Sequence, residues 1–301
     1  MASCDTSSVG DLEDIAAPSQ LERPSRGVRL RPSTKLPPPK APNEGTAAPG
    51  SHAIYVKTYG CSHNASDSEY MCGLLAAYGY TLLPETRRAE ADLWLINSCT
   101  VKNPSQDHLA TDIKKGKALS KPLVVAGCVP QADSTLSRPG GLFEGVSLLG
   151  VQQFDRVVEV VRHALEGNTV SMLDRPHGVR PALDLPKVRR NALVEIIPIN
   201  TGCLGSCAYC KTVHARGRLG SYLPEAIVRR AETAYAEGVC EVWLTSEDSG
   251  AYGKDIGSSL AELFSRLLPI VPDGRMLRVG MTNPPHILSQ LNAICEVRSA
   301  P

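Results

Sequence analysis

Short apolar runs alternate with amphipathic stretches from residue 53 onward, a pattern typical of β-α-β units and a parallel sheet. In the first half, the apolar runs predict strands over residues 53–57, 93–97, 123–126 and 146–149. Helices are predicted over residues 66–78, 105–119 and 154–166. Ser66 and Glu69 are expected to form a capping box for the first helix, and Gly167 closes the last. The pattern predicts one doubly wound α/β domain over residues 51–167.

A second β-α-β-α-β series follows. Strands are predicted over residues 193–199, 241–245 and 277–281, with helices over residues 224–237 and 259–268. Residues 168–190 are polar and contain prolines, so they are predicted to be an interdomain linker. Residues 1–50 hold 8 of the 23 prolines and lack an apolar period, which predicts a disordered leader. The fold class is therefore α/β, with a second domain over residues 191–301.

The composition of the 301 residues, 42% hydrophobic and 21% charged, excludes a collagenous or fully disordered chain. Lys and Arg number 32 against 31 Asp and Glu, so the net charge of +1 creates no global field that would attract a polyanion. No apolar run approaches the roughly 18 residues that a membrane-spanning helix needs. The acidic start of the chain does not resemble a secretory signal. We therefore expect a cytoplasmic chain without a membrane segment.

The ten cysteines are better explained as ligands than as a disulfide framework, because the cytosol keeps thiols reduced. Cys203, Cys207 and Cys210 follow an apolar strand with the spacing Cys-x3-Cys-x2-Cys. Three thiolates leave one iron of a 4Fe–4S cube open to a small molecule, whereas a structural zinc ion needs four closed ligands. The alternatives are a zinc site completed by His214 and three unrelated core thiols.

Cys61, Cys99 and Cys128 each come directly after a predicted parallel strand. Because the carboxyl ends of parallel strands meet at one edge of a sheet, we expect these three thiols to gather there. They are candidate ligands for a second 4Fe–4S cluster, again with one open iron. The alternative is that they are ordinary buried core cysteines.

The spacing of the Cys203 motif, with the aromatic Tyr209 just before its last cysteine, resembles the hallmark of the radical S-adenosylmethionine (SAM) superfamily. The resemblance implies that the open iron binds the amino and carboxylate groups of SAM. It also implies that an electron from the cluster splits the sulfonium and yields a 5′-deoxyadenosyl radical. The predicted position agrees with this, because barrel sites are built at the carboxyl ends of the strands.

An N-terminal three-cysteine domain followed by this motif resembles the methylthiotransferase family. Residues 58–69, 97–103, 126–131 and 244–253 look like the threonylcarbamoyladenosine tRNA methylthiotransferases of eukaryotes and archaea. The resemblance implies two 4Fe–4S clusters, SAM, an electron donor and a tRNA substrate. The implied reaction converts N6-threonylcarbamoyladenosine at position 37 of tRNA to its 2-methylthio derivative, with the cofactors carrying the chemistry. A related alternative is a methylthiotransferase that acts on isopentenyladenosine in tRNA.

Four further residues are candidate cofactor contacts. Glu247 matches the family position that contacts the SAM amino group, and the alternative is a solvated loop acid. Thr282 and Asn283 follow the last predicted strand and are expected either to touch SAM or to form a plain turn. Arg216 is a candidate planar fork for a carboxylate or phosphate, and the alternative is a solvated arginine.

The sequence departs from the family pattern in its second half. Residues 193–301 have room for three strands, about half of a complete radical SAM core, so we predict a partial radical SAM (β/α) barrel. Full-length eukaryotic members also carry a small RNA-binding domain and an anchor to the endoplasmic reticulum membrane, and neither pattern occurs here. We expect a C-terminally truncated fragment or splice product. The alternative to an active enzyme is a catalytically incomplete iron–sulfur protein.

Overall fold

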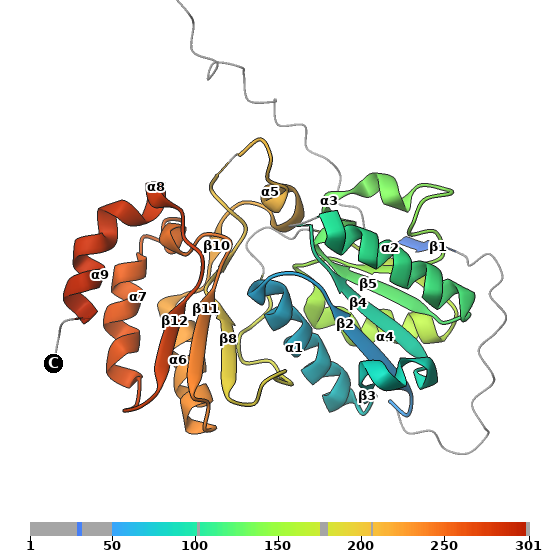
Figure 1. The fold of residues 1–301 in the computed structure, drawn as a ribbon, viewed down its shortest axis with the longest axis horizontal. Coiled ribbons are helices and arrows are strands. Elements are labelled where there is room, and N and C mark those ends of the chain that lie inside the picture. Colours follow the sequence, from blue (N-terminus) through green and yellow to red (C-terminus); the bar gives the residue numbers. More distant parts are fainter. Residues whose placement is uncertain (1–28, 32–49, 101–102, 175–179, 206, 299–301) are drawn as a thin grey trace, which may run out of the picture.

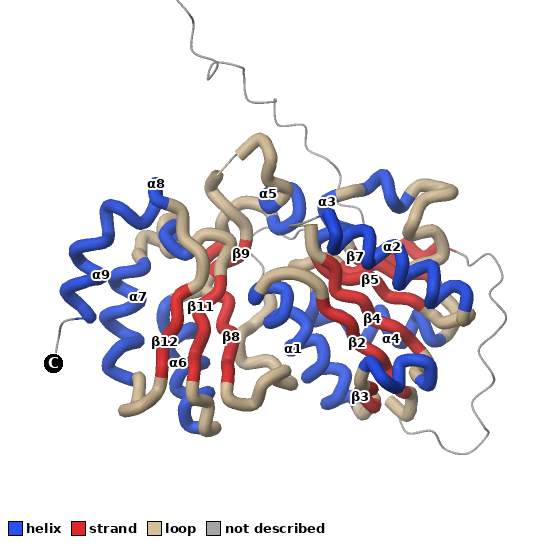
Figure 2. Tube along the Cα trace, viewed as in Figure 1, coloured by secondary structure: helices blue, strands red, loops and turns tan. Residues whose placement is uncertain are grey.

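The computed structural model describes residues 29–31, 50–100, 103–174, 180–205 and 207–298. Two α/β units lie side by side, each with its own sheet (Figure 1). Figure 2 shows that helices flank the strands of both sheets. Within the described segments, no helix combines the length and the apolar character needed to cross a membrane.

The first unit holds a seven-stranded sheet with the order β1-β7-β6-β5-β4-β2-β3. All neighbours run parallel except the antiparallel pair β1 and β7. The strands are β1 (Arg29–Arg31), β2 (Ala53–Thr58), β3 (Thr81–Leu83), β4 (Leu93–Ser98), β5 (Leu123–Gly127), β6 (Ser147–Leu149) and β7 (Thr169–Met172). The helices are α1 (Ser62–Tyr78), α2 (Asn103–Ala118), α3 (Cys128–Ala132) and α4 (Val157–Leu165). The strand order reverses between β2 and β4, which makes this the switch point where open α/β sheets bind ligands.

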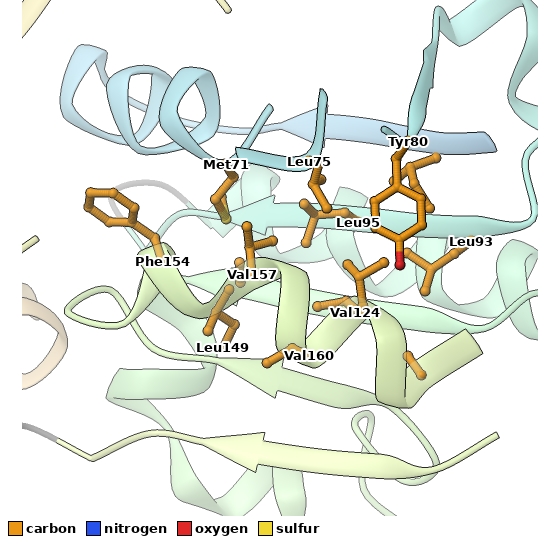
Figure 3. Packing of buried hydrophobic residues seen from close by; sticks show 14 of the residues in the cluster. Met71, Leu75, Tyr80, Leu93, Leu95, Val124, Leu149, Phe154, Val157 and Val160 are labelled. Atoms are coloured by element: carbon orange, nitrogen blue, oxygen red, sulfur yellow. The ribbon is translucent and has the colours of Figure 1, made fainter. Parts of the chain in front are cut away.

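Apolar side chains cover both faces of this sheet, because the residues of each strand alternate between the faces. Leu93 and Leu95 of β4 pack with Met71 of α1 and with α4 (Figure 3). Trp94 and Ile96 of the same strand belong to a second core that includes residues of α2. The two cores confirm the doubly wound arrangement predicted from the apolar runs.

The four predicted strands of this unit are confirmed to within one residue at each end. The predicted start of α1 is wrong, because the helix begins at Ser62 with Cys61 as its N-cap. Gly60, with a φ of 100°, turns the chain out of β2 and starts the helix a turn early. Ser66 and Glu69 therefore do not form a capping box. The Ser66 hydroxyl instead donates to a carbonyl in the second unit at 2.8 Å.

Besides short 3-10 segments, four elements of this unit were not expected from the sequence: β1, β3, β7 and the short helix α3. Strand β7 lies inside residues 168–190, the predicted linker, where Val170 and Met172 point into the core. The sheet therefore extends past the predicted domain boundary at residue 167. Strand β1 lies inside the predicted leader, and residues 1–28 and 32–49 of that leader fall outside the described residues.

The second unit holds a three-stranded parallel sheet with the order β12-β11-β8 and a small β9-β10 pair. Its strands are β8 (Val194–Pro198), β9 (Asn200–Thr201), β10 (Gly220–Ser221), β11 (Glu241–Thr245) and β12 (Met276–Val279). Its helices are α5 (Thr212–Arg216), α6 (Pro224–Ala236), α7 (Leu260–Leu267), α8 (Pro284–Ile287) and α9 (Leu291–Arg298). The predicted strands and helices match to within two residues. Three parallel strands agree with the predicted partial barrel.

A buried carboxylate joins the two units. Glu195 in β8 is fully buried, with Oε1 2.9 Å from Lys187 Nζ and Oε2 2.8 Å from Arg230 Nη2. Arg189 pairs with the same carboxylate, and Lys187 also lies 3.2 Å from Glu69 Oε2 on α1. Burial raises the pKa of Glu195, but Lys187 and Arg230 lower it by more, to about 2. The predicted linker therefore forms a charged bridge between the units.

Glu195→Gln is expected to lower the free energy of unfolding by about 3–5 kcal/mol, because it leaves buried cations without their carboxylate. Urea denaturation followed by tryptophan fluorescence measures this loss, since Trp94 and Trp243 report on one unit each. Glu225→Gln is the matched control, because Glu225 pairs with Arg266 at the exposed surface. Its loss should be much smaller. Equal losses in the two variants would contradict the role given to Glu195.

The same carboxylate predicts a pH dependence of stability. Its pKa of about 2 in the folded chain lies below the ordinary value of 4.5, so the ionised group stabilises the fold fully above the ordinary value. This contribution is lost as the pH falls through the folded pKa. The difference in unfolding free energy between the wild type and Glu195→Gln should therefore shrink between about pH 6 and pH 3 in urea titrations. A difference that stays constant over this range would rule the explanation out.

Candidate functional site

Three cysteines, called here the N-terminal thiol set, lie at the carboxyl ends of neighbouring parallel strands. Cys61 follows β2, Cys99 follows β4 and Cys128 follows β5, and β2, β4 and β5 are adjacent in the sheet. The structure thus brings the three predicted residues to one edge, beside the switch point. Parallel pairing with short turns after each strand is what produces this arrangement.

Contacts within the N-terminal thiol set are close. A hydrogen bond with Cys99 lowers the pKa of Cys61 to about 5, against the effect of burial and with further help from Arg216 and His63. Burial raises the pKa of Cys128 to about 11. At Gly60 an added Cβ would lie 2.3 Å from Cys99 Sγ, so only glycine allows this approach.

The motif thiol set, Cys203, Cys207 and Cys210, lines one cavity of about 220 Å³ in the second unit. His214 and Arg218 line it as well. No three Cys, His, Asp or Glu side chains in the described parts of the chain converge tightly enough for a single metal ion. A 4Fe–4S cube instead takes one thiolate at each iron, so its ligands need not converge. Three thiols around one cavity fit such a cube with one iron left open.

Tyr209, predicted from the motif, lies largely outside this cavity. Its side chain is 91% exposed. The charge of Cys207, together with a hydrogen bond to it, raises the pKa of Tyr209. The ring can therefore cover a ligand only from the rim of the motif loop.

The two thiol sets face a common interface, because the carboxyl edges of the two sheets meet there. Ser62, next to Cys61, lies 2.6 Å from Thr245 at the end of β11, hydroxyl to hydroxyl. Helix α3, which begins at Cys128, packs on α5, which follows the motif thiol set. Cys128 itself packs beside Ala215.

Arg216 lies in this interface, and the alternative of a solvated arginine is wrong. Its side chain is 3% exposed, and Nη2 donates to Asp67 Oδ2 at 2.7 Å and to Asn64 Oδ1 at 3.4 Å. Its Nε lies 3.0 Å from Glu247 Oε1. The guanidinium of Arg216 was predicted to bind a carboxylate or phosphate of a ligand. In the structure it instead contacts two carboxylates of the protein, those of Asp67 and Glu247. Asp67 and Asn64 were not predicted as site residues. Their position as polar residues early in a largely apolar helix was a signal that could have indicated them.

Glu247 is also buried, so the alternative of a solvated loop acid is wrong. Its side chain is 11% exposed, and Oε1 lies 3.1 Å from His63 Nδ1. The contacts with His63 and Arg216 are both made to Oε1, whereas Oε2 has no hydrogen bond to any described group. Burial raises the pKa of Glu247, but His63 and Arg216 lower it by more, so the group is ionised. A buried anion with unused acceptor capacity suits a ligand that brings a donor.

Thr282 and Asn283 both donate hydrogen bonds to Asp248, which was not predicted as a site residue. Asp248, buried at the end of β11, accepts hydrogen bonds from Thr282 Oγ1 at 3.3 Å and from Asn283 N and Nδ2, each at 3.1 Å. The only sequence signal was its position beside Glu247 after a predicted strand. Burial and, to a smaller extent, the charges of Asp248 and Glu247 raise the pKa of Cys203. Asp248 therefore fixes both candidate SAM contacts on the side of the motif thiol set.

This chain is similar to known proteins, first over the region that holds the N-terminal thiol set and then over nearly its whole length. A family model described as "Uncharacterized protein family UPF0004" matches residues 53–138. A curated relative from Drosophila pseudoobscura pseudoobscura, "Threonylcarbamoyladenosine tRNA methylthiotransferase", is 49% identical over 97% of this chain and 56% of its own length. A protein of the same name from Mus musculus is 48% identical over 100% of this chain and 53% of its own. The chain thus spans about half the length of these relatives.

Among solved structures, a match is the radical S-adenosylmethionine methyltransferase TsrM from Kitasatospora setae with cobalamin and a 4Fe–4S cluster bound. It has a TM-score of 0.48 and 12% identity, and covers 81% of this chain and 66% of the TsrM chain.

Gly60→Ala is expected to disrupt the N-terminal thiol set, because its Cβ would overlap Cys99 Sγ. Anaerobic reconstitution followed by iron analysis should give roughly half of the wild-type iron, if each thiol set binds one cube. Gly140→Ala is the matched control: Gly140 also has a positive φ, of 75°, but no atom lies within 4 Å of an added Cβ. Wild-type iron in Gly60→Ala, or an equal loss in both variants, would contradict the steric argument.

Proposed function

Because the chain belongs to the threonylcarbamoyladenosine tRNA methylthiotransferase family, we propose that it carries the two iron–sulfur centres and the SAM site of such an enzyme. The proposed reaction converts N6-threonylcarbamoyladenosine at position 37 of tRNA to its 2-methylthio derivative. The observation that carries the proposal is the meeting of two three-thiol sets at one interface. Each set leaves one iron of a 4Fe–4S cube without a protein thiolate.

The thiols divide the proposed cofactor binding between the two units. The motif thiol set would hold the cluster whose open iron binds SAM, and the N-terminal thiol set would hold a second cluster. When bound, the first cluster supplies the electron that cleaves SAM, and the second carries or supplies sulfur. Purine C2 is neither acidic nor electrophilic, so a radical is the reasonable way to remove its hydrogen.

The protein's own residues would bind and orient in this scheme. Asp248 holds Thr282 and Asn283 in place at the end of β11, where they would contact SAM. Glu247 is ionised, and its Oε2, which has no hydrogen bond to a described group, would accept from a ligand ammonium or from another donor. The packed interface around Arg216 would keep water away from the space between the thiol sets.

Two partners follow from the proposal: a tRNA that carries the modified adenosine, and a one-electron donor for the motif cluster. Both relatives described above have threonylcarbamoyladenosine in their names, which favours this substrate over isopentenyladenosine.

A catalytically incomplete iron–sulfur protein is the second candidate. The observation that favours it is the edge strand β12, where Met276 is 55% exposed and no further strand pairs among the described residues. Such a chain would bind iron without cleaving SAM.

Iron content and SAM cleavage test the proposal together. Anaerobic reconstitution should load about eight irons per chain, because two cubes hold four each. Replacing the motif thiol set by serines should remove about half of the iron and abolish formation of 5′-deoxyadenosine from SAM with dithionite. Replacing the N-terminal thiol set should remove the other half and leave 5′-deoxyadenosine formation in place. Mass spectrometry of a modified tRNA should detect methylthiolation only with both sets intact.

The matched control is Cys72→Ser with Cys240→Ser, since both residues lie outside the two sets. It should keep wild-type iron and SAM cleavage. Iron binding that survives loss of both sets would refute the proposed ligands. Full iron without 5′-deoxyadenosine would refute the enzymatic reaction and support the incomplete iron–sulfur protein.

A further inference from the structure

One buried cation is shared between the two units at the thiol sets. Arg216 ends α5, six residues after Cys210, and so belongs to the segment that carries the motif thiol set. Its guanidinium nevertheless contacts α1 of the first unit, through Asp67 and Asn64. The N-cap of α1 is Cys61, so the cation lies near the start of the N-terminal thiol set.

The backbone around Arg216 packs on the same set. Cys128 packs beside Ala215 and Val151, and the Arg216 carbonyl accepts from Gln152 Nε2 at 3.5 Å. Arg216 is thus fixed from both of its sides, by side-chain ion pairs and by packing of its own helix.

The charge of Arg216 acts on the thiols of the first unit. It is one of the causes that lower the pKa of Cys61, after the hydrogen bond with Cys99. It also opposes the rise that burial causes in the pKa of Cys128. Asp67 and Glu247 act on Cys128 in the opposite direction. The field at the N-terminal thiol set is therefore a balance of the Arg216 guanidinium and His63 against the carboxylates of Asp67 and Glu247.

We infer that Arg216 is a positioning residue that sets the reduction potential of the cluster on the N-terminal thiol set. The inference rests on the proposed function, since it requires a cluster on Cys61, Cys99 and Cys128. Reduction adds one electron to the cluster, and a buried cation stabilises that added charge strongly because little water screens it. Arg216 keeps its proton throughout. Asp67 and Glu247 limit the effect by partly cancelling the cation.

The test uses the full chain with the motif thiol set replaced by serines, so that only the N-terminal cluster remains. Electron paramagnetic resonance during titration with dithionite measures its midpoint potential. Arg216→Gln should lower the equilibrium constant for reduction at least tenfold, a shift of about 59 mV to more negative potential for one electron. Asp67→Asn keeps the shape of the partner and removes its charge, so it should move the potential in the positive direction. Arg216→Lys keeps the positive charge, so its midpoint potential should stay close to that of the chain with Arg216.

Opposite shifts separate an electrostatic role from a structural one, which would only reduce iron loading. Arg229→Gln is the control, because Arg229 is exposed and lies on α6, away from both thiol sets. It should leave the potential unchanged. If the background chain binds no iron, the second cluster of the proposed function is wrong. If it binds iron but Arg216→Gln and Asp67→Asn leave the potential unchanged, or shift it alike, the inference about Arg216 is wrong. If Arg216→Gln does not fold, Asp67→Asn alone decides by the sign of its shift.

Discussion

A charge can be buried between two domains only if it has a partner, and this constraint fixes how the two units of the protein meet. Arg216 lies with Asp67 and Glu247 near the thiol sets, while Glu195 lies with Lys187 along the linker. Each of these pairs or triads draws residues from different segments. A change in the relative position of the units would leave several charges unpaired at once, so the units are held in one arrangement.

Helix α1 carries the contact surface that makes this arrangement possible. One face of α1 contacts the second unit and the predicted linker, through Ser62, Ser66, Glu69 and Gly73. Ser62 contacts Thr245 after β11, and Ser66 donates to the Ile196 carbonyl of β8. Glu69 accepts from the Arg190 backbone N–H, and the backbone at Pro186 passes close to Gly73. Met71 and its neighbours face the sheet instead. The helix therefore packs on two sides, and its small polar stripe is a contact surface that is buried at Ser66, Glu69 and Gly73 and partly buried at Ser62.

Local pattern in the sequence decides the strands and the loops that follow them. The strands are apolar runs, and cysteines that follow neighbouring parallel strands lie at one edge, so the N-terminal thiol set was predictable. The motif thiol set was predictable because its three cysteines lie in one short loop. Contacts that join distant segments leave no such local pattern. The buried state of Arg216 depends on Asp67, 149 positions earlier, and β7 forms a strand because the sheet offers it an edge. Neither cause can be inferred from a short stretch of sequence. The polar stripe of α1 was not predicted because Ser66 and Glu69 were interpreted as a helix cap.

The reach of the chain limits how far apart the two thiol sets can lie. Cys210 and Arg216 are six residues apart, and a fully extended chain of that length spans at most about 20 Å. Because α5 is helical, with a rise of about 1.5 Å per residue, the true separation is shorter. Arg216 in turn contacts α1, whose N-cap is Cys61. A substrate atom that meets groups from both sets must therefore fit a narrow space, and any ligand that displaces the motif segment also displaces the cation beside the N-terminal thiol set. The interface between the two units therefore lies beside both thiol sets.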